Sequence, residues 1–412
     1  MKIRYIIIFI FICGFIGTAF SQTFINYNFT NSPLPDNQCR WIEIDSIGRK
    51  WFCTEFGIAV YDDTSWTVYN SSNSGLTDNS VKHLTFDNHG TAWISTQNGG
   101  VCTFDGINWN SYMLSTSGIT SNFVRSVNID ANNNKWICTD NGLNFYNDSA
   151  WSVYNILNSN IPVNHVTRII FENDTVRWIG TINGGLLKMT NDSFYTYSVQ
   201  SAGFPDNTIL AVERDTNNFI WVACPAGALL RGYAGNFFAF NTISSGIQSN
   251  SLTSLDIDSL QNIYIGSYDK GLIKKEGSFF SSWNTSNSDM PDDLVFCVKV
   301  ERNGIIWVGT NSNGVVRFDE NLWNNNFELI NENDFTISPV PCTNTLKIKF
   351  ENYSSKIVYI KDVCGRIILS QKINSGDVYT NLDIRNIKTG SYFLLIESAD
   401  GIVSKPFLIF EE

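Results

Sequence analysis

The sequence predicts an all-β protein: a seven-bladed β-propeller of four-stranded blades, its ring closed by the N-terminal strand, followed by a small C-terminal β-sandwich. Three observations support this prediction. Only 16% of the 412 residues are charged while 14% are aromatic, which favours strands and turns over exposed charged helices. A pattern of about 43 residues recurs seven times. Short alternating apolar segments follow the last repeat.

The N-terminus has the organisation of a secretory signal peptide, which we predict at residues 1–21. Lys2 and Arg4 precede an apolar run over residues 5–16, and Ala19 and Ser21 place small residues three and one before a cut at Gln22. The run is shorter than the roughly 20 apolar residues needed to cross a bilayer, and no later stretch approaches that length. We therefore expect an exported protein with no transmembrane helix in the mature chain.

Each repeat is anchored on one aromatic residue, and an acid stands six residues before it. The anchors, 42 or 43 residues apart, are Trp51, Trp93, Trp136, Trp178, Trp221, Tyr264 and Trp307. The acids are Asp45, Asp87, Asp130, Glu172, Asp215, Asp258 and Glu301. A carboxylate that accepts backbone N–H groups is what a tight hairpin needs, so we interpret these acids as structural.

After each anchor the repeat continues with a glycine turn, an apolar run and a second aromatic pair, which gives four short strands per unit, the content of one propeller blade. Residues 24–37 match residues 66–79 at an offset of 42. The mature chain therefore begins with an outer strand, and we predict that residues 24–28 complete the last blade and close the ring. We assign residues 22–328 to the propeller and regard residues 323–333 as mostly linker.

The repeats resemble a known family. FDNHGTAWISTQNGGVCTFDG (residues 86–106) and VERNGIIWVGTNSNGVVRFDE (residues 300–320) are similar to two-component regulator propeller repeats, found in periplasmic sensor regions of bacterial hybrid histidine kinases and in free-standing secreted proteins. The resemblance covers residues 24 to about 322. The sequence contains no kinase and no following immunoglobulin-like signalling module, so we do not expect the sensor-kinase role.

Residues 329–412 break the period and form the predicted β-sandwich. In SPVPCTNTLKI, KDVCGRII and LDIRNIKTGSYFLLI this segment resembles the type A C-terminal sorting domain of the type IX secretion system of the Bacteroidetes. The matching positions are Pro341, Asp362, Gly365, Arg366, Leu382, Gly390 and Tyr392. The resemblance implies that the type IX secretion machinery is a partner, that this domain is removed on export, and that the protein is secreted or held at the outer-membrane cell surface.

Eight of the nine cysteines remain after removal of the signal peptide, in a compartment that permits disulfides. Cys53 and Cys138 each follow an anchor by two residues, where other repeats have Ser, Gly or Ala, so we predict small buried side chains. Cys342 and Cys364 in the last domain form a candidate disulfide that spacing alone does not establish.

Catalytic motifs are missing from the sequence. The three histidines, His83, His89 and His165, fall at different phases of different repeats, so we interpret them as turn or strand-edge residues rather than metal ligands. There is no GxSxG elbow. We expect no enzyme, no cofactor and a monomer. With 28 basic against 39 acidic residues, nucleic acid is not an expected partner.

Alternating antiparallel connections place the glycine turns and the Asn-ended loops on the face opposite the acid hairpins. Propeller ligands are commonly bound by such loops, so the turn residues are the candidate binding residues. They are Glu55, Phe56, Gln97, Asn98, Asp140, Asn141, Asn183, Tyr268, Asp269, Lys270, Asn311 and Asn313. Amides and aromatic faces suit sugar hydroxyls and rings, which suggests a glycan ligand. The alternative for each Asn is that it tolerates left-handed backbone geometry.

Two other functions remain open at this point. A protein-binding scaffold at the cell surface would show exposed aromatic residues on the rim of the ring. A polysaccharide lyase or hydrolase would show two or more titratable groups with shifted pKa values in the central funnel, such as a pair of carboxylates.

Overall fold

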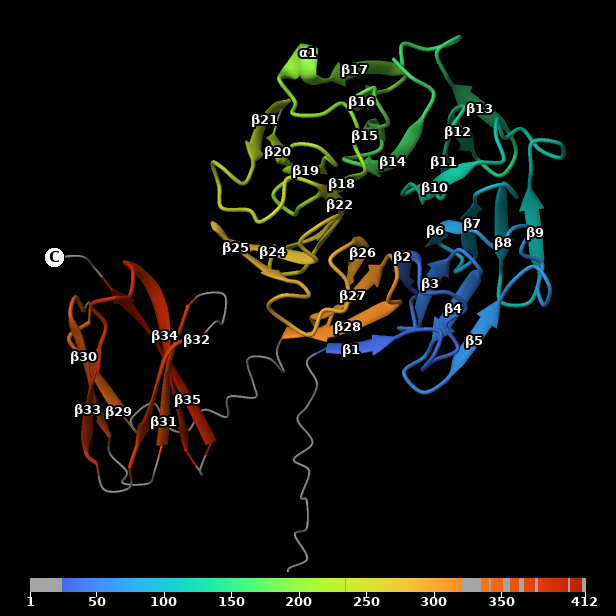
Figure 1. Cartoon of the computed structure of the whole chain (residues 1–412). Helices are drawn as coiled ribbons and strands as arrows, with labels where there is room; N and C mark the ends of the chain where they lie inside the picture. Colours follow the sequence, from blue (N-terminus) through green and yellow to red (C-terminus); the bar gives the residue numbers. More distant parts are fainter. Residues whose placement is uncertain are drawn as a thin grey trace, which may run out of the picture.

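The computed structural model describes residues 24–233, 235–320, 335–340, 342–350, 356–362, 367–374, 377–398 and 401–409. Its first part is a ring of seven four-stranded antiparallel sheets, the blades, each radiating from a common axis (Figure 1). In blades 1 to 6 the strand order within the sheet follows the chain, and blade 7 is completed from the N-terminus. The predicted propeller fold is confirmed.

The strands occupy four positions in the blades. The inner strands are β2 (Cys39–Ile44), β6 (Val81–Phe86), β10 (Val124–Ile129), β14 (Val166–Phe171), β18 (Ala211–Arg214), β22 (Leu252–Ile257) and β26 (Val295–Val300). The second strands are β3 (Lys50–Thr54), β7 (Ala92–Thr96), β11 (Lys135–Thr139), β15 (Val176–Thr181), β19 (Ile220–Ala223), β23 (Ile263–Ser267) and β27 (Ile305–Thr310). The third strands are β4 (Gly57–Tyr61), β8 (Val101–Phe104), β12 (Gly142–Tyr146), β16 (Leu186–Thr190), β20 (Leu229–Tyr233), β24 (Leu272–Glu276) and β28 (Val315–Asp319). The outer strands are β5 (Trp66–Tyr69), β9 (Trp109–Tyr112), β13 (Trp151–Tyr154), β17 (Ser193–Tyr197), β21 (Asn236–Phe240), β25 (Phe279–Trp283) and β1 (Phe24–Tyr27). A one-turn helix, α1 (Val199–Ala202), lies in the loop after β17.

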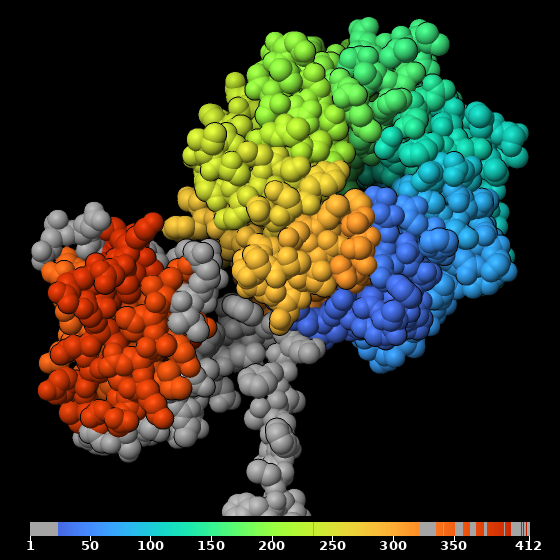
Figure 2. All heavy atoms as spheres, viewed as in Figure 1, coloured from blue at the N-terminus to red at the C-terminus, as the bar shows by residue number. Residues whose placement is uncertain are grey.

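The two ends of the ring meet in blade 7 and at the interface of blade 7 with blade 1, and we call this region the seam. Strand β1 pairs antiparallel with β28, in register from Phe24 opposite Phe318 to Tyr27 opposite Val315. The Phe24 and Phe318 rings stack with centroids 4.4 Å apart. In the space-filling view the N-terminal blue lies directly against the orange of the last blade (Figure 2). The prediction that residues 24–28 close the ring is therefore confirmed.

The acid hairpins tie each blade together through the anchor tryptophan. In blade 3, the backbone N–H groups of Asn132 and Asn134 donate to Asp130 Oδ1, at 3.0 and 2.8 Å. The buried Trp136 donates from Nε1 to Asp130 Oδ2 at 3.0 Å. The same indole-to-carboxylate bond recurs in six blades: Trp51 to Asp45, Trp93 to Asp87, Trp136 to Asp130, Trp178 to Glu172, Trp221 to Asp215 and Trp307 to Glu301. The structural interpretation of these acids is confirmed, and the indole bond adds to the predicted backbone bonds in the blades whose hairpin acid is Asp. In blades 4 and 7, where the acid is Glu, the side chains of Asn173 and Asn303 accept the backbone N–H groups instead.

In blade 6 the anchor is a tyrosine, and its polar atom bonds to a different acid. The Tyr264 hydroxyl donates to Glu320 at 3.1 Å instead of to the hairpin acid. Asp258 accepts from the Asn262 side chain at 2.8 Å. The cysteines that stand two residues after an anchor, Cys53 and Cys138, are fully buried, as predicted.

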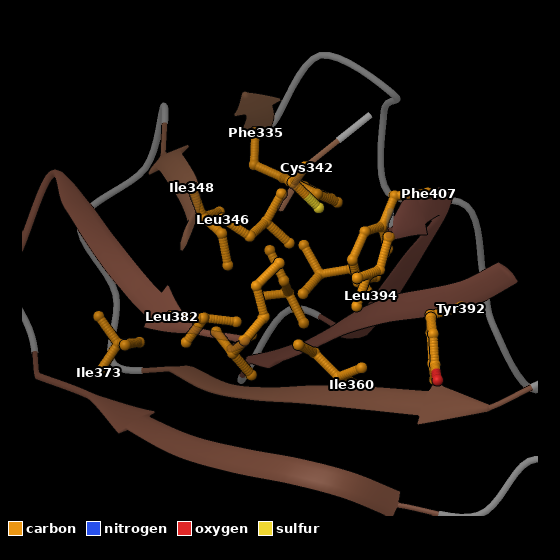
Figure 3. Packing of buried hydrophobic residues seen from close by; sticks show 14 of the residues in the cluster. Phe335, Cys342, Leu346, Ile348, Ile360, Ile373, Leu382, Tyr392, Leu394 and Phe407 are labelled. Atoms are coloured by element: carbon orange, nitrogen blue, oxygen red, sulfur yellow. The ribbon is translucent and has the colours of Figure 1, made fainter. Parts of the chain in front are cut away.

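The C-terminal strands form two sheets packed face to face. One sheet has the order β29 (Phe335–Ser338), β30 (Thr345–Phe350), β33 (Tyr379–Asp383). The other has the order β32 (Ile367–Ile373), β31 (Lys356–Asp362), β34 (Gly390–Ser398), β35 (Gly401–Ile409). Apolar side chains from both sheets, including Leu346, Leu382 and Leu394, meet in one buried cluster (Figure 3). This is the predicted β-sandwich.

Of the sorting-motif positions, four lie among the described residues. Leu382 is fully buried in the core, and Tyr392 is nearly so, with its hydroxyl donating to the Lys388 carbonyl at 2.8 Å. Asp362 ends β31 and Gly390 begins β34. Pro341, Gly365, Arg366 and Cys364 lie outside the described residues, as do residues 1–21 and 323–333, so the disulfide and signal-peptide predictions stay predictions.

Candidate functional site

The glycine turns between second and third strands share one face of the ring with the loops that connect successive blades. In blade 2, Gly100 has φ +73°, and a Cβ there would lie 2.2 Å from the Tyr112 carbonyl oxygen, so only glycine fits. Its N–H donates to the Asn122 carbonyl of the next loop at 3.0 Å. The Asn122 side chain in turn accepts the Leu114 N–H at 2.8 Å. The loop asparagines are thus part of the scaffold of this face, which we call the glycine-turn face.

The twelve predicted turn residues all lie on this face, with different exposure. Seven are exposed: Phe56, Asn98, Asn141, Asn183, Tyr268, Asp269 and Lys270. Five are half-buried: Glu55, Gln97, Asp140, Asn311 and Asn313. Among the five asparagines of the turns, only Asn183 has a positive φ, at 65°, so left-handed geometry explains Asn183 and not the others.

Several turn side chains are already used by the fold. Asp269 Oδ1 accepts from the Ser249 hydroxyl at 2.5 Å. Asn311 Oδ1 accepts from Gln38 Nε2 at 2.8 Å, and Asn141 Nδ2 donates to the Thr120 carbonyl at 3.2 Å. Within the part of the chain that the structure describes, the side chains of Asn98, Tyr268 and Lys270 form no hydrogen bond or ion pair. These three remain available to a ligand.

Glu55 organises a basic cluster that the sequence analysis missed. Its carboxylate lies 2.9 Å from Arg40 Nε and 2.8 Å from Lys82 Nζ, and it also accepts from the Ser80 hydroxyl. Burial alone would raise the pKa of Glu55, but the hydrogen bonds from Lys82, Ser80 and Arg40 outweigh it and lower the pKa to about 2. The carboxylate is therefore ionised throughout the neutral range.

A third cation, Arg125, stands at the equivalent position of blade 3. It lies 2.8 Å from Asp140, another predicted turn residue. Arg40, Lys82 and Arg125 are each the second residue of an inner strand, at the position where the register shifts. Two aromatic rings flank them, with Arg40 4.1 Å from the Phe296 centroid and Arg125 4.8 Å from that of Phe123. Aligning the inner strands by repeat would have revealed this group.

A second cluster of charges lies deeper along the axis, on the inner strands, and all of its members except Arg168 lie opposite an anchor. Lys299 Nζ is 2.9 Å from Glu43 across the seam, and Arg168 is 2.9 Å from Glu213 of the next blade. Asp256 accepts the Val300 N–H at 2.7 Å. These four paired side chains keep 16 to 26% of their surface accessible, although they are surrounded by inner strands. They line the centre of the ring.

Burial sets the protonation of this axis cluster. Burial raises the pKa values of Glu213 and Asp256 above the ordinary range, and Arg168 and Lys299 respectively offset part of that rise. Burial would lower the pKa of Lys299, but the carboxylates of Glu43 and Asp256 outweigh it and raise that pKa. The funnel therefore holds titratable groups with shifted pKa values.

Trp41 packs beside this cluster. Its ring lies 4.3 Å from the Arg168 guanidinium and 4.3 Å from the His83 ring, and its Nε1 donates to the Leu84 carbonyl at 3.0 Å. The interpretation of His83 as a turn or strand-edge residue is wrong: it lies inside β6 and is buried, and burial, with Arg168 and Lys299, lowers its pKa well below the ordinary value. The imidazole is neutral.

Two kinds of feature are absent from the described residues. No three His, Cys, Asp or Glu side chains lie together as metal ligands among them. Nor does any helix in the described part of the chain have the length and apolar character to span a membrane.

Structural comparison identifies similar propellers. The chain is similar to a protein described as the extracellular domain of a hybrid two-component system from B. thetaiotaomicron, with 21% identity and a TM-score of 0.65, over 94% of this chain and 57% of that one. It is also similar to PorZ, described as an essential bacterial surface component of the type-IX secretion system of Porphyromonas gingivalis, with 14% identity, a TM-score of 0.57, and coverage of 91% and 60%. The chain thus spans less than two thirds of either.

A third similar fold is the virginiamycin B lyase of Staphylococcus aureus, with 13% identity, a TM-score of 0.58, and coverage of 71% of this chain and 98% of that one. At these identities the likenesses show the fold alone. No curated protein matches the chain in sequence.

The C-terminal part matches a sequence family. Residues 336–410 match the model of the secretion system C-terminal sorting domain, in agreement with the resemblance noted in the sequence. This match supports export through the type IX secretion system and a secreted or cell-surface location. Residues 336–410 of this chain are therefore a secretion system C-terminal sorting domain, carried behind a seven-bladed β-propeller.

Proposed function

We propose that this chain is an exported, non-enzymatic binding protein whose propeller binds a glycan on its glycine-turn face. The observation that carries the proposal is the contrast between the two faces. On the opposite face the hairpin acids are committed to the fold in every blade that has a tryptophan anchor. On the glycine-turn face, Asn98, Tyr268 and Lys270 present an amide, a ring and an ammonium that the fold does not use.

The chemistry of this face suits a polyhydroxylated ligand. An amide donates and accepts toward vicinal hydroxyls, and an aromatic face packs on the apolar side of a sugar ring. Phe56, 62% exposed, and Tyr268, 40% exposed, supply such rings on the glycine-turn face. The cations Arg40, Lys82 and Arg125 stand on the inner strands just below the turns and would favour sugars that carry a carboxylate or sulfate.

The test is a glycan array probed with the full mature chain, followed by mass spectrometry of each bound glycan for cleavage products. Binding without products, lost in Asn98→Ala or Tyr268→Ala and kept in Thr67→Ala on an outer strand, supports the proposal. Products from any bound glycan contradict the non-enzymatic assignment. Wild-type binding that survives both turn substitutions contradicts the glycine-turn face.

One observation favours the protein-scaffold alternative. Tyr195, Phe238 and Phe279, on the outer strands of blades 4, 5 and 6, are 62, 73 and 81% exposed. Exposed aromatic side chains on consecutive blades are typical of protein-binding surfaces. Under this alternative, Phe238→Ala weakens capture of a protein ligand and the turn substitutions do not.

Another observation favours the lyase or hydrolase alternative. Glu213 and Asp256 are half-buried carboxyl groups with raised pKa values, the feature that an acid catalyst in the funnel requires. Against this, Glu213 is ion-paired with Arg168, and the Arg168 guanidinium is in turn packed on the Trp41 ring. If the array yields products, loss of product formation in Glu213→Gln or Asp256→Asn, with binding retained, would assign catalysis to the axis.

A further inference from the structure

Two buried cysteines meet at the seam of the ring. Cys39 is the first residue of β2 in blade 1, and Cys297 is the third residue of β26 in blade 7. They are 0 and 1% exposed and belong to the same apolar cluster, together with Trp307 and Val315. The seam therefore carries two thiols on the two blades that have to be held together.

The two cysteine side chains are neighbours, and both are free thiols in the structure. Cys297 Sγ lies 3.8 Å from the Cys39 carbonyl oxygen. Both sulfurs point at Gly309: a Cβ built on that glycine would be 2.4 Å from Cys297 Sγ and 3.1 Å from Cys39 Sγ. Burial, and then the neighbouring Cys297 thiol, raise the pKa of Cys39. The two side chains are thus adjacent.

The repeat makes this pair specific to the seam. The residue equivalent to Cys39 is Val81, Val124, Val166, Leu252 and Val295 in blades 2, 3, 4, 6 and 7, in register with the second-strand Thr or Ser. The third cysteine nearby, Cys53, belongs to the cluster between blades 1 and 2, although it is close enough to Cys297 to interact with it electrostatically. Among the described residues, Cys53 of blade 1 and Cys102 of blade 2 also share one buried cluster. What distinguishes Cys39 and Cys297 is that both of their sulfur atoms approach the same residue, Gly309.

We propose that Cys39 and Cys297 form a disulfide in the exported protein, which closes the ring covalently. The sorting domain supports export, and an exported chain passes through a compartment that permits disulfides. This inference does not depend on which ligand the propeller binds.

The chemistry requires an oxidant, which we take to be the disulfide form of a thiol–disulfide oxidoreductase. The thiolate of one cysteine attacks that disulfide and displaces one of its sulfurs, giving a mixed disulfide. The second cysteine then attacks the mixed disulfide and releases the reduced oxidant. The two cysteines lose two protons and two electrons, and the oxidant becomes a dithiol. Because both thiols are buried in the closed ring, the exchange precedes the final packing of blade 7 on blade 1, and the completed bond is shielded from reductants.

The experiment is peptide mapping of the full chain expressed with export to the periplasm or cell surface. Free thiols are alkylated in intact cells and again under denaturation before tryptic digestion without reductant. We expect one cross-linked species joining the peptide that ends at Arg40 to the peptide that ends at Lys299, and its loss on reduction. Recovery of both peptides in alkylated form would overturn the proposal, as would a cross-link of either cysteine to Cys53.

A stability measurement distinguishes the bond from mere proximity. Wild type that has been unfolded, reduced and refolded in reductant should melt several degrees below the oxidised wild type, because the cross-link restricts the unfolded chain. Cys39→Ser and Cys297→Ser should melt at the reduced value and be insensitive to reductant. Cys138→Ser, which alters a buried cysteine away from the seam, should keep the reductant sensitivity. A wild type insensitive to reductant would contradict the proposal even if all variants fold.

Discussion

The ammonium of Lys299 in blade 7 lies 2.9 Å from the carboxylate of Glu43 in blade 1, so the first and last inner strands are joined by an ion pair at the axis. The pair is enclosed by inner strands, and Asp256 adds a second negative charge that raises the pKa of Lys299. A charge removed here leaves its partner desolvated and unpaired, which costs more than the pair itself contributes.

Lys299→Met should therefore destabilise the propeller by about 3 kcal/mol, because Glu43 loses its partner. Adding Glu43→Gln should restore part of that loss. Urea unfolding of both single variants and the double variant would give the coupling energy, expected to exceed roughly 1 kcal/mol. Additive losses would show that the two side chains do not stabilise one another.

Low pH should lower the stability of the propeller because it protonates Glu55 on the glycine-turn face. The pKa of Glu55 is about 2 in the folded chain against an ordinary 4.5, so the stabilisation is complete above pH 4.5 and is lost as the pH falls toward 2. Glu55→Gln should lower stability at pH 7 by about 2 to 3 kcal/mol. In urea titrations the difference between wild type and variant should stay constant from about pH 6 to pH 4.5 and shrink from there to about pH 2.5. A difference that stays constant down to about pH 2.5 would refute the shifted pKa.

Substitution of a hairpin acid should destabilise the propeller more than substitution of an exposed acid in a hairpin of the same type. Asp130→Ala removes acceptors from two backbone N–H groups and from Trp136 Nε1, and should cost about 3 kcal/mol. Asp174→Ala, at an exposed position in the blade 4 hairpin, should change stability by less than about 0.5 kcal/mol. Denaturant unfolding followed by tryptophan fluorescence compares the two, and equal effects would contradict the structural role of Asp130.

The N-terminal strand should be required for the ring. Phe24→Ala removes the ring that stacks on Phe318 and opens a cavity in the core of blade 7, so we expect a loss of about 3 kcal/mol. The exposed Phe29→Ala, five residues on, should be nearly neutral. Thermal unfolding of both variants provides the measurement, and a neutral Phe24→Ala would mean that the seam does not depend on this strand.

The repeat made most of the fold predictable, because the same local requirements recur in register. An acid six residues before Trp136 implies a hairpin, and the extra outer strand at residues 24–28 implies closure, with no tertiary information needed. The one-turn helix α1 had no such signal, since its capping Ser198 and its terminal Gly203 occur in a single loop.

The charged axis could not be predicted in the same way. Glu43, Glu213, Asp256 and Lys299 occupy one register position, opposite the anchors, but the other blades have Thr85, Asn128 and Ile170 there. No motif links such different residue types, and they become neighbours only when the ring closes. The glycine-turn residues were easier to find because their turns are marked by glycine, although the sequence did not distinguish Asn98 from the asparagines that the fold uses.

The pairing of β1 with β28 also determines how the protein can come apart. Blade 7 contains strands from both ends of the propeller, so neither end can detach without disrupting that blade. Loss of β1 exposes the apolar side of blade 7. Loss of β26, β27 and β28 leaves β1 without the strand that it pairs with among the described residues. Opening thus has to begin with the loss of a whole blade. For a protein outside the cell, where surface proteases attack frayed termini, such a ring offers no gradual route of digestion.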